Sequence, residues 1–239
     1  LLIALLMGLS AKAESSGTCG PNLKWHLTDD GVLTITGKGE MYDYSYTPWS
    51  YDNLTRVIIG NGVTTIGEAA FRSCSHLTSV NIPNSVTTIK EYAFSDCSHL
   101  TSVTIPNSVT TIGDNAFNGC SSLTSVTIPN SVTTIGGWAF SICSSLTSVT
   151  IPNSVTTIGD NAFMGCSSLT SVTIPNSVTR IGSEAFSDCT NLQKVNIGNS
   201  VKTIGEFAFN KCTNITQISS EAVVPPTCES GVFFYVNTS

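Results

Sequence analysis

A repeat of 23 residues is the feature that most constrains how this chain can fold. The stretch TSVTIPNSVTTIGDNAF occurs twice without change, at residues 101–117 and 147–163. Three residue types recur with the period of the repeat: cysteine (Cys74, Cys97, Cys120, Cys143, Cys166, Cys189, Cys212), phenylalanine (Phe71, Phe94, Phe117, Phe140, Phe163, Phe186, Phe209) and isoleucine (Ile59, Ile82, Ile105, Ile128, Ile151, Ile174, Ile197). Such a fixed period predicts a solenoid, because one coil alone cannot bury its apolar side chains whereas stacked coils can.

The order of residue types within one coil predicts two short strands and a tight return. In LTSVTI (residues 100–105) apolar and polar residues alternate, as in a strand with one buried face. Pro106 cannot donate a ladder hydrogen bond, so IPNS is predicted to turn the chain into a second strand, VTTI. We expect Gly113 to form a left-handed turn. The segment DNAFNGC (residues 114–120) is then predicted to return as a tight turn or 3₁₀ segment.

The repeated string also carries a family resemblance. From Thr55 to about Ile218 the pattern C-x-x-L-x-x-V-x-I-P-x-x-V-x-x-I-G-x-x-A-F resembles the BspA-like, or Treponema pallidum type, leucine-rich repeats. The segments CGPNLKWHLTDDGVLTITGKGEM and SSEAVVPPTCESGVF resemble the two ends of the repeat region in that family. This resemblance implies a β-rich leucine-rich-repeat solenoid that is secreted or displayed on a cell surface. It also implies adhesion to host proteins or to other cells.

The two ends of the chain depart from the repeat. The apolar run Leu1–Met7, followed by Ala11-Lys12-Ala13, predicts a signal peptide that is truncated at its start, rather than a buried terminal helix. The strands around Asp29-Asp30-Gly31 predict a β-hairpin. We therefore expect a signal peptide at 1–13, an N-terminal cap with a hairpin at 14–54, seven coils at 55–218 and an incomplete C-terminal cap at 219–239.

The charge of the chain restricts its partners. Charged residues make up only 11% of the sequence, and the net charge is −6. Between Ser98 and Thr179 the only charged side chains are Asp114 and Asp160. This balance argues against nucleic acid and anionic membranes as partners, and no membrane span is predicted in the mature chain. The expected partners are surface proteins or glycans of host or neighbouring cells.

The outward positions of the LTSVTI strands are the candidate binding face. They form one column that is mostly serine and another that is mostly threonine, and in leucine-rich-repeat proteins this face usually contacts the ligand. The candidate residues are Ser102, Thr104, Ser125, Thr127, Ser148, Thr150, Ser171 and Thr173. Three alternatives remain open: a solvated face without a partner, a structural spacer for a domain beyond residue 239, and an ice-binding surface.

The cysteine column is predicted to consist of buried free thiols. Equivalent side chains on stacked coils point the same way about 4.8 Å apart, whereas a disulfide needs Cβ atoms that converge to about 3.8 Å. Cys19 and Cys228 belong to opposite caps and are not expected to pair. His76 and His99 occupy equivalent positions, but two histidines without a third ligand do not predict a metal site. No cofactor is expected, and the absence of catalytic motifs predicts that the protein is not an enzyme.

An aromatic cluster precedes the first coil. Its members are Tyr42, Tyr44, Tyr46, Trp49 and Tyr51. Such a cluster can stack against sugar rings, or it can cover the open apolar end of the solenoid while its polar groups stay in water. We favour the cap, because an uncovered solenoid end promotes aggregation.

Overall fold

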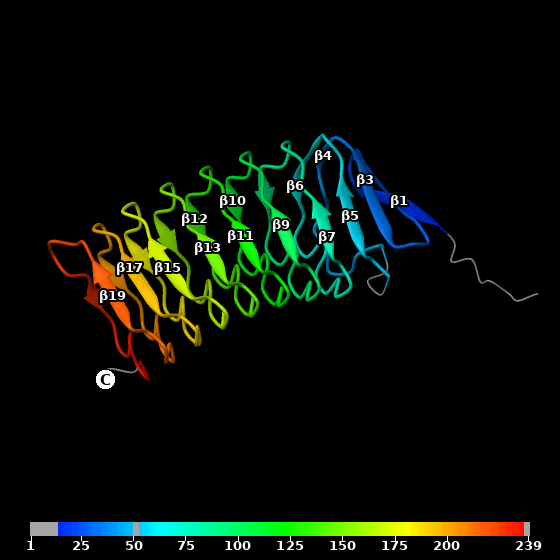
Figure 1. Ribbon diagram of the computed structural model, residues 1–239. Coiled ribbons are helices and arrows are strands. Elements are labelled where there is room, and N and C mark those ends of the chain that lie inside the picture. The colour runs from blue at the N-terminus through cyan, green and yellow to red at the C-terminus, as the bar shows by residue number, and fades with distance from the viewer. Residues whose placement is uncertain (1–13, 50–52, 237–239) are drawn as a thin grey trace, which may run out of the picture.

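The computed structural model describes residues 14–49 and 53–236, and these residues form one elongated solenoid (Figure 1). Every regular element in the described part of the chain is a β-strand, and consecutive coils stack side by side along the long axis (Figure 1). The predicted fold class, a β-rich repeat solenoid, is therefore confirmed. The described residues include no helix that could cross a membrane. The segment predicted as a signal peptide, 1–13, lies outside the described residues.

One long side of the solenoid is formed by the first strand of each coil. These strands pair in parallel with their repeats in register, so that Ser125 lies between Ser102 and Ser148. The strands are β5 (Arg56–Ile59), β7 (Ser79–Asn81), β9 (Ser102–Thr104), β11 (Ser125–Thr127), β13 (Ser148–Thr150), β15 (Ser171–Ile174), β17 (Lys194–Ile197) and β19 (Gln217–Ser220). The ladder is interrupted between β7 and β9 and again between β13 and β15. This side, called the strand face below, therefore has three sections.

The second strand of each coil forms the opposite side. This sheet has nine strands and is continuous from end to end. The strands are β4 (Gly39–Glu40), β6 (Val63–Ile66), β8 (Thr88–Ile89), β10 (Thr111–Ile112), β12 (Thr134–Ile135), β14 (Thr157–Ile158), β16 (Arg180–Ile181), β18 (Thr203–Ile204) and β20 (Thr227–Cys228). The turn between the two strands is tied across coils, since the Ser108 hydroxyl donates to the carbonyl of Val86 at 2.6 Å.

The predicted role of Gly113 is wrong. Gly113 does not have a positive φ; the left-handed residues of this coil are Asn115, with a φ of 56°, and Gly119, with a φ of 72°. The reason for glycine lies in packing, because a Cβ atom at Gly113 would lie 2.7 Å from the backbone nitrogen of Glu91 in the preceding coil. The glycine therefore permits a close approach between coils.

The return segment is also not a 3₁₀ helix. Its N–H groups alternate between two kinds of acceptor. Ala116 donates within its own coil to the carbonyl of Gly113 at 3.3 Å, whereas Asn115 and Phe117 donate at 2.8 Å to carbonyls of the next coil. Every second N–H group of the return segment thus donates to the neighbouring coil. In a continuous 3₁₀ helix these N–H groups would donate within the segment instead.

The phenylalanine column forms the centre of the core. All seven side chains are fully buried. Phe140 stacks on Phe117 at a centroid distance of 5.4 Å and on Phe163 at 5.6 Å, as the repeat predicts. The stack is extended by Trp49 at one end and by Phe233 at the other, each 5.6 Å from the neighbouring ring.

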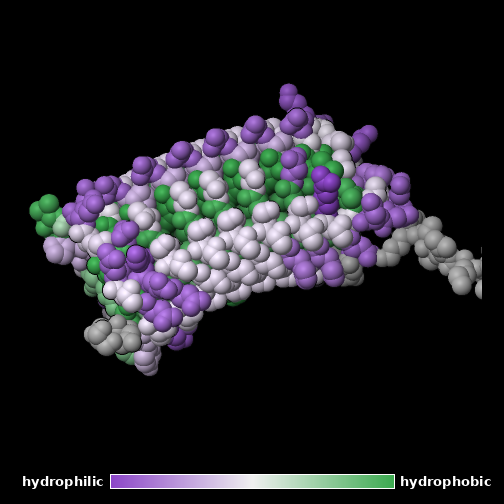
Figure 2. Space-filling model, in the orientation of Figure 1, coloured by the Kyte–Doolittle hydropathy of each residue, from purple (hydrophilic) through white to green (hydrophobic). Residues whose placement is uncertain are grey.

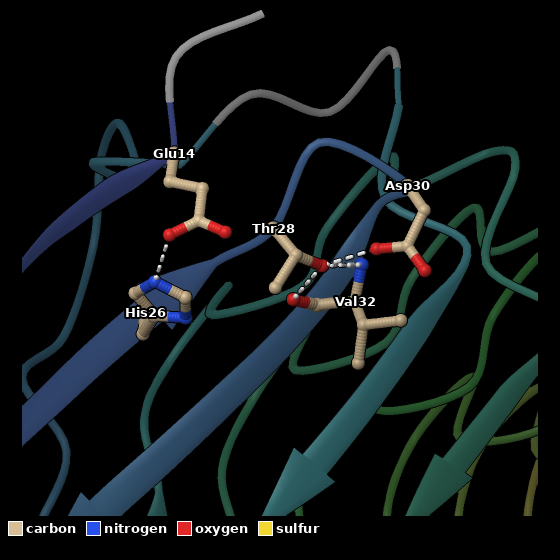
Figure 3. Close-up of polar contacts among 5 residues, drawn as sticks. All are labelled: Glu14, His26, Thr28, Asp30 and Val32. Atoms are coloured by element: carbon tan, nitrogen blue, oxygen red, sulfur yellow. Dashed lines mark hydrogen bonds and ion pairs between the residues drawn. The ribbon is translucent and has the colours of Figure 1, made fainter.

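The N-terminal cap is an antiparallel sheet joined to the first coil. Strand β1 (Ser15–Gly20) pairs with β2 (Leu23–Leu27), which pairs with β3 (Val32–Gly37), and β3 runs parallel to β5. The Thr28 hydroxyl closes the hairpin turn: it contacts the Asp30 carboxylate and accepts a 3.1 Å bond from the N–H of Val32 (Figure 3). His26 on β2 pairs at 3.1 Å with Glu14, the residue before β1 (Figure 3).

The aromatic cluster divides into buried and exposed members. Trp49 is 2% exposed and covers the first phenylalanine, so the capping role is confirmed for this residue. Tyr44 packs edge-on against Trp49 at 5.4 Å. Tyr42 and Tyr46, in contrast, are 47% and 88% exposed and contribute little to the cap. Tyr51 lies outside the described residues.

The coil pattern continues after residue 218. Strand β20 pairs with β18, and the turn after β20 has left-handed residues at Gly231 and Tyr235, at the spacing seen in the complete coils. Several apolar side chains here are exposed, among them Val223 at 97% and Val224 at 77%.

Candidate functional site

All eight candidate residues lie on the strand face, on β9, β11, β13 and β15, and all are exposed. Thr127 pairs in register with Thr104 and Thr150, which gives a continuous row of threonine side chains across three coils. Ser171 and Thr173 lie in the next section of the face, where they pair in register with Lys194 and Asn196. The strand geometry therefore brings the candidates together as two polar rows.

A groove runs beside these rows at the interruption between β13 and β15. It has a volume of about 740 Å³. Its lining combines candidate residues with apolar and amide groups: Ser148, Thr150, Ser171, Thr173, Val149, Ile151, Ile174, Pro175, Asn153, Asn176, Asn196, Ile197, Gly198, Ser219 and Glu221. Val149 is only partly buried, whereas Val126 and Val172 are 4% and 2% exposed, so the interruption uncovers apolar surface. Figure 2 shows a hydrophobic band along this face, beside a row of hydrophilic groups.

The groove offers hydrogen bonds but little charge. Glu221 is the one charged residue in its lining. Serine and threonine hydroxyls both donate and accept, and asparagine amides do the same. The lining contains no histidine, cysteine or paired carboxylates that could act as a nucleophile or a general base. Among the described residues no group of three side chains is arranged to hold a metal ion. The arrangement is suited to contacting an extended polar surface.

Comparison with known proteins places the repeat in a family. Residues 42–170 and 138–237 match the BspA type leucine-rich repeat region, with six copies. The chain belongs to this BspA-type family. Among solved structures, the leucine-rich repeat protein of T. pallidum is 27% identical and has a TM-score of 0.63; the match covers 93% of this chain and 92% of that one. A leucine-rich repeat protein from Eubacterium ventriosum is 29% identical over 86% of this chain and 78% of that one, with a TM-score of 0.41. No curated protein matches the sequence.

The cysteine column of this BspA-type chain has a role that the sequence does not reveal. All nine cysteines are free, and the seven in the column are buried. Six thiols of the column donate to the carbonyl of the phenylalanine in the preceding coil; for example, Cys143 Sγ lies 3.3 Å from the Phe117 oxygen. The thiol is a second donor to this buried carbonyl, which also accepts the N–H of Cys120 at 3.3 Å, and alanine or valine could not supply it. The repeat predicts the column but cannot show which carbonyl it reaches.

Burial also makes these thiols weak acids. Desolvation raises the pKa of Cys74, Cys120 and Cys166 from 9.0 to about 12. The thiolate is the reactive form of cysteine, so these groups are inert near neutral pH. Cys19 and Cys228 lie in the two caps, the first buried and the second exposed, and neither forms a disulfide.

The two histidines weighed as metal ligands form a stack on the BspA-type solenoid. The rings of His76 and His99 are 5.9 Å apart and nearly parallel, at 7°. Nδ1 of His99 lies 2.5 Å from the carbonyl oxygen of Ser75 and pairs with it, which leaves that nitrogen occupied. The pair is thus held by its own coils.

Proposed function

We propose that this protein is secreted or displayed on a cell surface and adheres to proteins or glycans of host or neighbouring cells. The observation that supports the proposal is the regular arrangement of polar side chains on the strand face. Eight exposed hydroxyl side chains lie there in two rows, beside a groove with apolar walls. The apolar N-terminal pattern and the BspA-type family support a location outside the cytoplasm.

The chemistry of the face indicates many weak contacts instead of one strong contact. The rows lack the tryptophan, tyrosine and arginine side chains that dominate tight interfaces. The same donor and acceptor groups recur in each coil, and Ser102, Ser125 and Ser148 pair in register. Repetition along one molecule, and many copies on one cell, raise the effective affinity without any strong single contact.

Two alternatives receive less support from the same face. An ice-binding surface needs matched threonines on a flat sheet, but here one row is serine and the ladder is interrupted twice. A spacer would need no organised surface, and it predicts that changes to the exposed rows have no effect on adhesion. The experiment below separates it from the proposal.

The test places charge on one face at a time. Thr127→Lys with Thr150→Lys introduces two adjacent charges on the strand face, and Thr111→Lys with Thr134→Lys introduces the same two charges on the nine-stranded sheet. All four side chains are exposed, so both variants should fold. Beads coated with each protein are scored for attachment to cultured animal cells and to bacterial cells. We expect the strand-face variant to lose attachment and the control to keep it; equal attachment by both variants would refute the proposal.

A further inference from the structure

A second pocket lies where the N-terminal cap meets the return turns of the first two coils. It has a volume of about 580 Å³. Its lining includes Tyr44, Tyr46, Glu68, Arg72, Ser73 and Tyr92. None of these residues belongs to the strand face, so the pocket is separate from the binding surface proposed above. It also draws on residues that occur only once, unlike the rows of that surface.

Arg72 gives this pocket a fixed positive group. Its guanidinium lies over the ring of Tyr92, 5.1 Å from the ring centroid, an arrangement that holds the side chain in place. In the described part of the chain no carboxylate comes within ion-pair distance of Arg72, and the nearby Lys90 is already paired with Asp43 at 2.9 Å. A guanidinium stays charged at all ordinary pH values, and its planar N–H groups match the two oxygens of a carboxylate.

Tyr46 supplies an open aromatic face beside that charge. The side chain is 88% exposed, which is unusual for a ring in a region that has to cover a solenoid end. Trp49 already covers the phenylalanine column, and Tyr44 is held by its contact with Trp49 and by a 3.4 Å bond from its hydroxyl to the Cys19 carbonyl. Tyr46 is therefore not needed for the cap, and its ring is available to the C–H face of a sugar.

The backbone at Tyr92 is strained for its residue type. Its φ is 55°, a left-handed value that costs a bulky residue free energy. The equivalent positions in the third and fifth coils hold Asn115 and Asn161, and asparagine tolerates this conformation better. A tyrosine at this position brings a ring under Arg72 at a local cost to the backbone. The left-handed value itself belongs to the repeat, because Ala69, Trp138 and Phe207 have it at the equivalent position too, so the second coil is distinguished by its tyrosine ring and not by its backbone.

We propose that this pocket binds the carboxylate-bearing residue of an acidic glycan. Arg72 pairs with the sugar carboxylate, the ring of Tyr46 stacks against the apolar face of the sugar, and Glu68 and Ser73 form hydrogen bonds with its hydroxyl groups. The proposal does not depend on adhesion through the strand face. A glycan is favoured over an acidic peptide because the exposed ring and the single cation lie beside a carboxylate, Glu68, which accepts bonds from hydroxyls but repels additional acidic groups.

The test compares an acidic sugar with its neutral parent. Binding of sialyllactose and of a glucuronate-terminated disaccharide to the whole chain is measured by calorimetry, with lactose as the neutral probe. We expect both acidic probes to bind about tenfold more tightly than lactose, as one charge-assisted bidentate pair predicts, and less tightly as salt increases. Arg72→Gln should abolish the preference, and Tyr46→Ala should weaken binding of the acidic and neutral sugars alike.

Two matched controls keep the result specific. Arg180→Gln removes an exposed arginine that is paired with Asp160 far from the pocket, and it should leave binding unchanged. Trp138 has the same left-handed conformation as Tyr92, with a φ of 52°, but lies outside the pocket. Trp138→Asn is therefore the control for Tyr92→Asn: both replace an aromatic residue by asparagine at a left-handed position. Of these two variants, only Tyr92→Asn should lose binding. Equal affinity for lactose and the acidic probes, absence of binding to both acidic sugars, or stronger binding of a glutamate-rich peptide would overturn the proposal.

The strand-face variant separates this proposal from the first one. Thr127→Lys with Thr150→Lys should lose cell attachment but keep its preference for sialyllactose over lactose. If sialyllactose binding is lost in that variant and kept in Arg72→Gln, the sugar binds on the strand face and the pocket proposal is wrong.

Discussion

The substitution Phe140→Ala tests the energetics of the whole stack. Phe140 is fully buried between Phe117 and Phe163, and its ring is within 2° and 7° of parallel to theirs. Truncation of a buried phenylalanine to alanine costs about 3–5 kcal/mol, through lost transfer free energy and the cavity that remains. We expect a value near the top of that range, because both neighbours are held by 2.8 Å backbone bonds between coils and cannot move in to fill the space.

Urea denaturation followed by circular dichroism measures this loss directly. Hydrogen exchange of the backbone amides then locates it, since stability in repeat arrays depends on each coil and its nearest neighbours. Protection should decrease most in the coils around residues 113–170 and little at the caps. Phe140→Leu is the matched control, because it retains most of the volume and should cost less than about 1.5 kcal/mol. A Phe140→Ala protein that unfolds at the parent's urea midpoint, with unchanged exchange, would refute the stacked-core reasoning.

Three further predictions follow from the core and the cap. Cys143→Ala should lower the free energy of unfolding by about 1–2 kcal/mol in urea, since it removes one of two donors to the Phe117 carbonyl and leaves a small cavity, whereas Cys228→Ala, at an exposed site, should have no effect. Burial raises the pKa of Cys120 from 9.0 to about 12. As the pH rises, the unfolded chain therefore loses this thiol proton before the folded chain does, and the folded state loses stability. The urea midpoint should be highest below pH 9 and decrease towards pH 12. Trp49→Ala should expose the first coil and cost about 3–5 kcal/mol by denaturation.

The repeat made the core predictable because its columns follow directly from the period. Once seven coils are in register, the burial of Phe140 and the exposure of Thr127 need no further information. The return turn was harder, because glycine is compatible with two explanations. A glycine at position 113 is compatible with a left-handed turn and with a close approach of two backbones. The second explanation is correct, because the backbone of Glu91 in the preceding coil lies too close for a Cβ atom.

The groove on the strand face could not be predicted from local sequence at all. Residues 147–156 and 170–179 have the same sequence, TSVTIPNSVT, yet the ladder is interrupted between the strands they contain. The interruption therefore depends on the other residues of these coils or on how the coils stack, and not on these ten residues. The partial exposure of Val149 is a consequence of that arrangement.

The two surfaces proposed above would recognise their ligands in different ways, because one consists of repeated residues and the other of residues that occur once. The rows of serine and threonine are the same in each coil from Ser102 to Thr173, so a ligand that reads them can bind in several equivalent registers. Such a surface provides avidity but no fixed position. The pocket of Arg72, Tyr46 and Tyr92 occurs once, at the junction with the cap, and a ligand bound there has one position and one orientation. A chain that uses both surfaces would therefore attach along its length and select its target at one end.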